Sequence, residues 1–422
     1  MTVEVSTLAN GMRIVTHAMP HLETVSLGIW VGCGARSECR TLNGISHLLE
    51  HMAFKGTERR NARQIVEEIE AVGGDINAAT SLESTAYYAR VLKDDVALAI
   101  DILGDILQHS QFHGSELTRE RDVILQEIAA ANDCPDDVAF DAVQETAFPD
   151  QALGRPILGT TETVGRVTRA NLIEHMSRNY LGGDMVLSAA GKLQHDQVVR
   201  HAEAQFGRLN SGNGPPLEVA RYAGGPCVRT KPFEQTHAIL AFLGPSYRDD
   251  AFYAAQVFSG LLGGGLSSRL FQEVRERRGL CYSIYSFCNA MSDVGLFGVH
   301  AGTTDELVPE LRDVVIAELS EIAAQGPGDD ELQRSKAQLK AGLAMSLEST
   351  GARAEQMARQ LLAFGRPLGV DELVGRVEAV SCADVQSTAE RIVTGSRPTW
   401  SHVGPGVPNA DYDHLTARLA GG

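Results

Sequence analysis

The stretch TVSLGIWVGCGARSE, residues 24–38, recurs in outline as THAILAFLGPSYRDD, residues 236–250. In both stretches a run of β-branched and aromatic residues, typical of a strand, leads into a polar turn. The two stretches begin 212 positions apart, and Arg36 of the first falls opposite Arg248 of the second. This similarity indicates an internal repeat that divides the chain into two related halves.

A second pair of segments supports the repeat. SELTRERDVILQEI, residues 115–128, aligns with DELQRSKAQLKAGL, residues 330–343, and both have the apolar spacing of a helix. Residues 209–226 are rich in Gly, Pro, Ser and Asn, as linkers are. We therefore expect two homologous α+β halves: an N-terminal domain over residues 1–208, a linker over 209–226, and a C-terminal domain over 227–422.

The composition is that of a soluble globular protein, since 43% of the residues are hydrophobic and 22% are charged, with no apolar run long enough to span a membrane. The net charge of −17 argues against nucleic acid as a partner, because phosphate binding requires clustered Lys and Arg. The seven cysteines are scattered without a CxxC pair, which favours reduced thiols. The first residues have the layout of neither a secretory signal nor a transit peptide. We therefore expect a cytoplasmic location.

The stretch GISHLLEHMAFKGT, residues 44–57, carries two histidines four positions apart. In a helix, His47 and His51 lie on the same face, so their imidazole nitrogens can converge, and Glu50 borders that face. A catalytic zinc ion takes three protein ligands and a water, and a neighbouring carboxylate can act as the general base. The motif is the inverse of the common zinc-protease motif. The alternative is a half-buried helix whose histidines bond to the backbone.

A second helix offers the third ligand. Glu120 and Glu127 are seven positions apart, so they project from the same face of a helix over residues 115–128. One of them can bind the metal while the other orients a histidine. Glu127 lies among apolar residues, where a carboxylate usually has a partner, and a cation is a natural one. A solvated charged helix is the alternative, and it accounts well for Glu120.

The five polar residues of these two helices have no similar residues opposite them in the C-terminal half. In the repeat, His47, Glu50 and His51 align with Ser259, Leu262 and Gly263. Glu120 aligns with Ser335, and Glu127 aligns with Gly342. If the polar residues were needed only to hold the fold, the second half would need them too. The difference indicates chemistry in the N-terminal half.

The chain resembles the pitrilysin-like zinc peptidases of family M16, within them the branch that contains the β subunit of mitochondrial processing peptidase and its bacterial single-chain relatives. That family carries HxxEH with a glutamate ligand about 76 residues after the second histidine, and here 127 − 51 = 76. The resemblance implies one zinc ion per chain, bound by His47, His51 and Glu127. It also implies that Glu50 is the general base and that Glu120 contacts a metal ligand without binding the metal itself.

GGDINAATSLESTAYY, residues 73–88, resembles the family's active-site edge strand. The resemblance implies that Asn77, Ala78 and Thr80 lie near the substrate. Alternating side chains after a Gly-Gly turn suit an edge strand that can pair with an extended peptide. A plain hairpin strand is the alternative.

RERRGLCYSIYS, residues 275–286, resembles the segment through which the family's C-terminal half contributes an arginine and a tyrosine, here Arg275 and Tyr282. Such a pair can donate hydrogen bonds to the substrate carbonyl and to the tetrahedral oxyanion. Without the resemblance, we would interpret Arg275 as a charged surface residue and Tyr282 as an ordinary strand residue.

CPDDVAFDAV, residues 134–143, matches acidic positions that bind an arginine near the cleavage site in the mitochondrial enzyme, here Asp137 and Asp141. At this spacing the two can share one helix face and hold a guanidinium. Acidic residues at the start of a helix are the alternative.

The resemblance implies two homologous α/β sandwich halves, each with a largely antiparallel sheet and helices, that form a clamshell around a cavity. The implied function is a zinc-dependent endopeptidase that cleaves extended peptides or presequence-like substrates near basic residues. We expect peptide substrates and a homodimer. The short glycine stretch of residues 261–271 favours the catalytic side of the family. The alternative is a noncatalytic structural or assembly subunit of the same fold.

Overall fold

Residues 3–406 and 412–420 are described by the computed structural model. They form two compact units, each with its own sheet and hydrophobic core. Unit 1 comprises Met1–Ala129, Arg155–Glu218 and Ala344–Leu368, and unit 2 comprises Ala130–Gly154, Val219–Leu343 and Gly369–Gly422.

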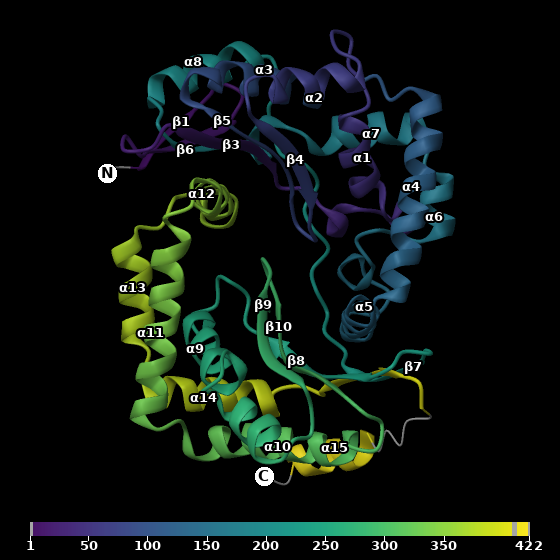
Figure 1. Ribbon diagram of the computed structural model, residues 1–422, viewed down its shortest axis with the longest axis vertical. Helices are drawn as coiled ribbons and strands as arrows, with labels where there is room; N and C mark the ends of the chain where they lie inside the picture. The colour runs from purple at the N-terminus through teal and green to yellow at the C-terminus, as the bar shows by residue number, and fades with distance from the viewer. Residues whose placement is uncertain (1–2, 407–411, 421–422) are drawn as a thin grey trace. The chain divides into compact units, whose positions relative to one another are not determined.

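The sheet of unit 1 has six strands in the order β1-β2-β6-β3-β5-β4. Figure 1 labels β4, the last strand of this order. The strands are β1 (Val3–Thr7), β2 (Arg13–Ala18), β3 (Thr24–Val31), β4 (Asp75–Thr80), β5 (Thr85–Leu92) and β6 (Met185–Gly191). All neighbouring strands are antiparallel except β2 and β6, which are parallel. Strand β4 lies at one edge of this sheet.

The central strand β3 is an almost continuous apolar run because both of its faces are covered. On one face Leu27 and Ile29 belong to the main core of unit 1, together with residues of α3 (Val96–Gln108) and α8 (His195–Phe206). On the other face Trp30 packs with residues of α12 (Thr350–Phe364). A strand that is buried on both faces loses the polar alternation of a surface strand.

Unit 2 repeats this plan with five strands in the order β7-β11-β8-β10-β9. The strands are β7 (Gly225–Thr230), β8 (Thr236–Gly244), β9 (Ser283–Ala290), β10 (Gly295–Thr303) and β11 (Thr399–Gly404). Again one neighbouring pair, β7 and β11, is parallel and the others are antiparallel. The matching order confirms the repeat read from the sequence, in which the start of β3 aligns with the start of β8.

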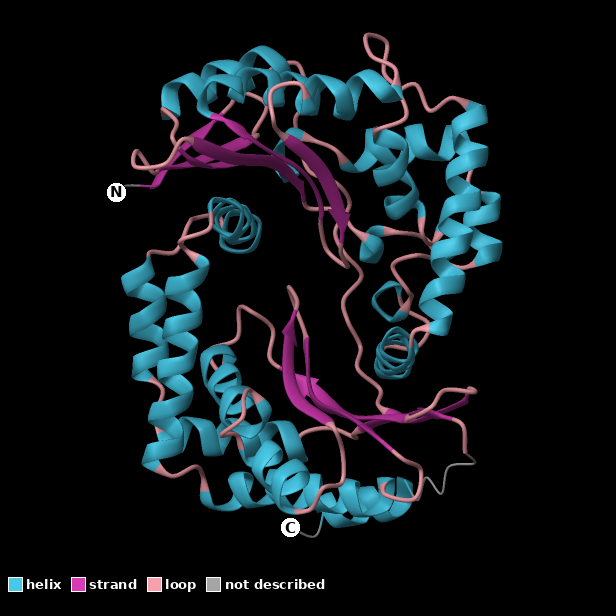
Figure 2. Ribbon diagram, viewed as in Figure 1, coloured by secondary structure: helices cyan, strands magenta, loops and turns pink. Residues whose placement is uncertain are grey.

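The core of unit 2 lies between one face of its sheet and a group of helices (Figure 2). These helices are α9 (Phe252–Gly263), α10 (Val308–Gln325) and α14 (Cys382–Thr394). Phe258 of α9 stacks on Phe297 of β10 with ring centroids 4.5 Å apart. The remaining helices of the two units are α1 (Ile45–Ala53), α2 (Ala62–Glu70), α4 (Gly114–Asp133), α5 (Pro135–Ala147), α6 (Thr161–Arg166), α7 (Arg169–Asn179), α11 (Asp329–Ser346), α13 (Val370–Ala379) and α15 (Tyr412–Ala420).

Each unit takes one helix from the other half of the sequence. Helix α5 precedes the 209–226 segment but packs on β7, β8 and β11 of unit 2. Helix α12 follows that segment but packs on β2, β3 and β6 of unit 1. The domains predicted from the sequence are continuous segments, residues 1–208 and 227–422, so they assign α5 to the first domain and α12 to the second. The units of the structure assign these two helices the other way round. The reason is physical: apolar spacing identifies the buried face of a helix, but not which sheet that face covers.

The mixture of largely antiparallel sheets and helices in both units confirms the predicted α+β class. Within residues 3–406 and 412–420, no helix combines the length and the apolar character needed to cross a membrane.

Candidate metal centre

Helix α1 carries the HLLEH motif and begins at a turn held by a buried carboxylate. Gly44 precedes the helix with φ of 91°, and a Cβ at this position would lie 2.7 Å from the carbonyl oxygen of Leu158. Glu38 accepts the backbone N–H of Gly44 at 2.7 Å and that of Ser46 at 2.8 Å. These bonds satisfy N–H groups that every helix start leaves without an internal partner. The position of α1 is therefore fixed.

The buried apolar residues of α1 determine which side of the helix carries the two histidines. Leu48, Leu49 and Met52 are fully buried in the core of unit 1, so the opposite side of the helix remains half-buried. His47 and His51 lie on that side, with ring centroids 4.7 Å apart. The predicted helix and the shared face of its histidines are both present.

Glu127 of α4 meets the two histidines. Its Oε2 lies 3.7 Å from Nε2 of His47 and 3.7 Å from Nε2 of His51. Ligand atoms around a tetrahedral zinc ion, with bonds of 2.0–2.1 Å, lie about 3.3 Å apart. The three side chains therefore approach the spacing of a zinc site, and a fourth position could be taken by water.

The protonation states also suit a metal ion. Burial, and secondarily the charge of His51, lowers the pKa of His47 to about 4, so its imidazole is neutral at pH 7. His51 Nδ1 lies 3.1 Å from Oε2 of Glu120, which leaves Nε2 facing Glu127. Such a carboxylate contact fixes which nitrogen of a metal-binding histidine carries the proton. His47 Nδ1 is buried with no hydrogen-bond partner among the described residues. The residues therefore fit a divalent ion.

Glu120 is itself held from a second side. Its Oε1 forms an ion pair with Nζ of Lys55 at 2.8 Å, and its side chain is 9% exposed. Lys55 and His51 thus contact the two oxygens of this buried side chain. The sequence does not predict this role of Lys55, because Lys55 and Glu120 are 65 positions apart and no local pattern brings them together.

Glu50 is near the histidines but outside the group of three ligand atoms. Its Oε2 accepts a hydrogen bond from Oγ1 of Thr80 at 2.5 Å. Burial raises the pKa of Glu50, and the bond from Thr80 opposes that rise. A half-buried carboxyl with a raised pKa is suited to take and return a proton.

The edge strand β4 contains the three predicted substrate-contacting residues. Among the described residues β4 pairs with β5 alone, so no strand covers its other side. Asn77 Oδ1 accepts the backbone N–H of Ala78 at 2.8 Å. Thr80 is the one that touches a site residue, through its bond to Glu50.

The remaining predicted residues belong to unit 2. Arg275 lies in a π-helix, Phe271–Arg277, a type of turn frequent at functional sites. Its guanidinium carbon is 4.8 Å from the centroid of the Tyr282 ring and 4.7 Å from that of Phe271. Tyr282 is 76% exposed. Asp137 and Asp141 lie four positions apart on α5, and both are exposed.

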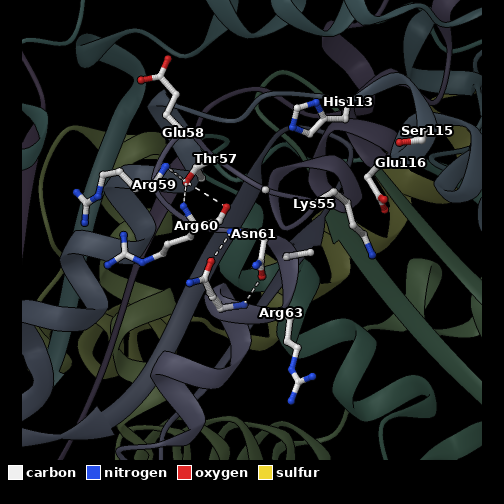
Figure 3. Close-up of a pocket in the computed structure, with 13 residues that line it drawn as sticks. Lys55, Thr57, Glu58, Arg59, Arg60, Asn61, Arg63, His113, Ser115 and Glu116 are labelled. Atoms are coloured by element: carbon white, nitrogen blue, oxygen red, sulfur yellow. Dashed lines mark hydrogen bonds between the residues drawn. The ribbon is translucent and has the colours of Figure 1, made fainter.

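A surface pocket of about 610 Å³ also lies in unit 1 (Figure 3). Arg59, Arg60 and Arg63 line one part of it, and Lys55, His113 and Glu116 line another. The pocket does not include the three ligand residues. Lys55 is its link to them, through the ion pair with Glu120.

Two family descriptions divide the chain between them. Residues 13–161 match Insulinase (Peptidase family M16), and residues 166–339 match the Peptidase M16 inactive domain. The first match contains every residue of the candidate metal centre. The chain belongs to peptidase family M16.

Relatives along almost the whole chain carry names that agree with this family. An uncharacterized zinc protease of Streptomyces coelicolor is 40% identical over 96% of this chain and 90% of its own length. The uncharacterized zinc protease YmxG of Bacillus subtilis is 36% identical over 92% of this chain and 95% of its own.

Solved structures share the fold at lower sequence identity. A protease from Helicobacter pylori has a TM-score of 0.88 at 20% identity and covers 96% of this chain and 99% of its own. A peptidase M16 inactive domain from Pseudomonas fluorescens has a TM-score of 0.89 at 20% identity and covers 97% of this chain and 99% of its own.

Proposed function

We propose that the protein is a zinc-dependent endopeptidase that cleaves extended peptides. The observation that carries this proposal is the convergence of His47 Nε2, His51 Nε2 and Glu127 Oε2 beside the carboxylate of Glu50. Two imidazoles and one carboxylate are a ligand set of catalytic zinc in peptidases. The names of the relatives, which are zinc proteases, support the same metal and reaction.

When bound, zinc supplies a Lewis acid for the scissile carbonyl and lowers the pKa of a bound water to about 7. Glu50 takes the proton of the attacking water and later gives it to the leaving amine. The Thr80 hydroxyl donates to Oε2 of Glu50 and so orients this carboxylate. Glu120 keeps the ring of His51 oriented and its Nδ1 protonated.

Substrate binding is assigned to the free side of β4. An extended peptide adds there as a further strand, bound by the backbone groups next to Asn77 and Ala78. Backbone pairing does not depend on sequence, so other side chains must select the cleavage site. Asp137 and Asp141 are our candidates for a preference for basic residues, including presequence-like peptides.

Arg275 and Tyr282 keep the role that the family resemblance implies for them. They would donate hydrogen bonds to the substrate carbonyl and to the oxyanion. Their cation–π contact explains why the two would act as a pair. A homodimer and a cytoplasmic location stay predictions.

The test compares metal content with cleavage. Glu127→Gln should lower the zinc bound per chain by about one ion relative to the wild type and abolish cleavage of a quenched fluorescent peptide. Asp122→Asn, an exposed carboxylate on the same helix, is the matched control and should change neither. Unchanged zinc content in a folded Glu127→Gln variant would overturn the metal assignment. Zinc binding without any peptide cleavage would favour a noncatalytic subunit.

A further inference from the structure

A second group of metal-binding side chains lies in unit 2, apart from the candidate metal centre. It consists of Asp136 in the first turn of α5, His237 on β8 and His300 on β10. The two histidines project from the same face of the sheet, because β8 and β10 are antiparallel neighbours in which His300 pairs with Ile239, two residues from His237. Helix α5 covers this face and brings the carboxylate.

The three ligand atoms form a nearly equilateral triangle. Asp136 Oδ1 lies 2.9 Å from His237 Nδ1 and 3.1 Å from His300 Nε2. The two nitrogens lie 3.1 Å from each other. All three separations are within a few tenths of the about 3.3 Å expected around a tetrahedral zinc ion.

Hydrogen bonds alone do not require this arrangement. Both nitrogens could donate to Asp136 Oδ1 only if each ring carried its proton on the nitrogen that faces the carboxylate. If one nitrogen donated to the other, no N–H would remain for the carboxylate, because the accepting nitrogen carries no proton. Three lone pairs that converge on one point are the arrangement that a cation requires.

The surroundings would hold the ligands in place and leave one side open. The side chain of His300 is 2% exposed, that of His237 13% and that of Asp136 57%. The His300 ring stacks on Phe140 of α5, with centroids 5.8 Å apart, and lies 4.9 Å from the ring of Tyr285. As with His47, its second ring nitrogen is buried with no partner among the described residues. An ion and its water could enter past Asp136.

We propose that Asp136, His237 and His300 form a second binding site for a divalent transition-metal ion, with zinc the best match to two imidazoles and one carboxylate. The site shares no residue with the candidate metal centre and goes beyond the proposed peptidase function. Two of its ligands are in the sheet and the third is in α5. The ion therefore fastens to unit 2 the helix that comes from the other half of the sequence.

The test is a titration of the metal-free full-length chain with Zn²⁺ against a chromophoric chelator. The wild type should bind two equivalents, Asp136→Asn and Glu127→Gln one each, and the double variant none. Asp136 is exposed, so its replacement should preserve the fold. Asp137→Asn, the neighbouring exposed carboxylate, is the matched control and should bind two.

Each result separates the two sites. If the wild type binds one equivalent that Glu127→Gln removes, the second site is wrong and the cluster is held by hydrogen bonds alone. If Asp136→Asn removes the single equivalent instead, the second site stands and the first is wrong. A second readout is thermal unfolding: Zn²⁺ should raise the melting temperature of Glu127→Gln but not that of the double variant. An equal rise in both would contradict the proposal.

Discussion

The carboxylate of Glu120 lies 3.1 Å from Nδ1 of His51, while the other ring nitrogen of that histidine lies 3.7 Å from Glu127. The imidazole thus has a carboxylate at each of its nitrogens, one of them paired with Lys55. We expect Glu120→Gln to bind zinc at the first site about 10–100-fold more weakly, because the ring loses its charged partner. Competition titrations would measure this, with Asp122→Asn as the control. Unchanged affinity would show that Glu120 serves the fold and not the metal.

Glu50→Gln should separate metal binding from cleavage. The amide keeps the size of the side chain but cannot take a proton, so we expect unchanged zinc content and a kcat lower by about 10²-fold or more. Thr80→Val removes only the hydrogen bond to Oε2 and should have the smaller effect. Single-turnover rates on a fluorescent peptide, measured next to zinc content, would check both. Full activity in Glu50→Gln would remove it from the reaction.

His175 should make unit 1 sensitive to acid. It is buried on α7, where Ser46 Oγ lies 3.2 Å from its Nε2, and burial lowers its pKa to about 4. Because the folded pKa lies below the unfolded value of about 6.5, the neutral ring contributes stability above pH 6.5, which is lost as the pH falls toward 4. The contribution amounts to about 3 kcal/mol. Urea unfolding of the wild type should therefore weaken more over this range than that of His175→Gln, and parallel pH profiles would contradict the prediction.

Leu361→Ala should destabilise unit 1, although Leu361 lies in the C-terminal half of the sequence. The side chain is fully buried in the cluster that α12 forms with Trp30 and other residues of the first sheet. Removing it should cost about 2–5 kcal/mol. Hydrogen exchange of the β2, β3 and β6 amides would locate the effect. Arg359→Ala, exposed on the same helix, should cost less than about 0.5 kcal/mol.

The parts of this structure that were predictable from the sequence depend on local spacing. The strand pattern of residues 24–31 and its repeat predicted two similar sheets, and the four-residue spacing placed His47 and His51 on one face. The seven-residue spacing made Glu120 and Glu127 candidates for the third ligand, but the assignment of Glu127 as the ligand came from the family resemblance, since no local pattern joins α4 to α1.

The contacts that were missed join residues that are far apart in the sequence. Thr80 contacts Glu50 from another element, and Lys55 pairs with Glu120 of α4. Asp136, His237 and His300 come from three separate elements, and their spacing along the chain, 101 and 63 positions, matches no metal motif. The exchange of α5 and α12 could not be predicted from the sequence either. The two sheets have the same plan, so each offers a similar surface to either helix.

That exchange has a consequence for the integrity of the chain. A protease cut within residues 209–226 would yield two fragments, but the first would still carry α5 in the sheet of unit 2 and the second would still carry α12 in the sheet of unit 1. The nicked protein should elute as one particle and separate only in denaturant. For the same reason, the fragments should be insoluble when each is produced alone and should restore the fold when they are produced together. The two halves of this polypeptide are thus obligate partners, as in a heterodimer whose subunits have been joined.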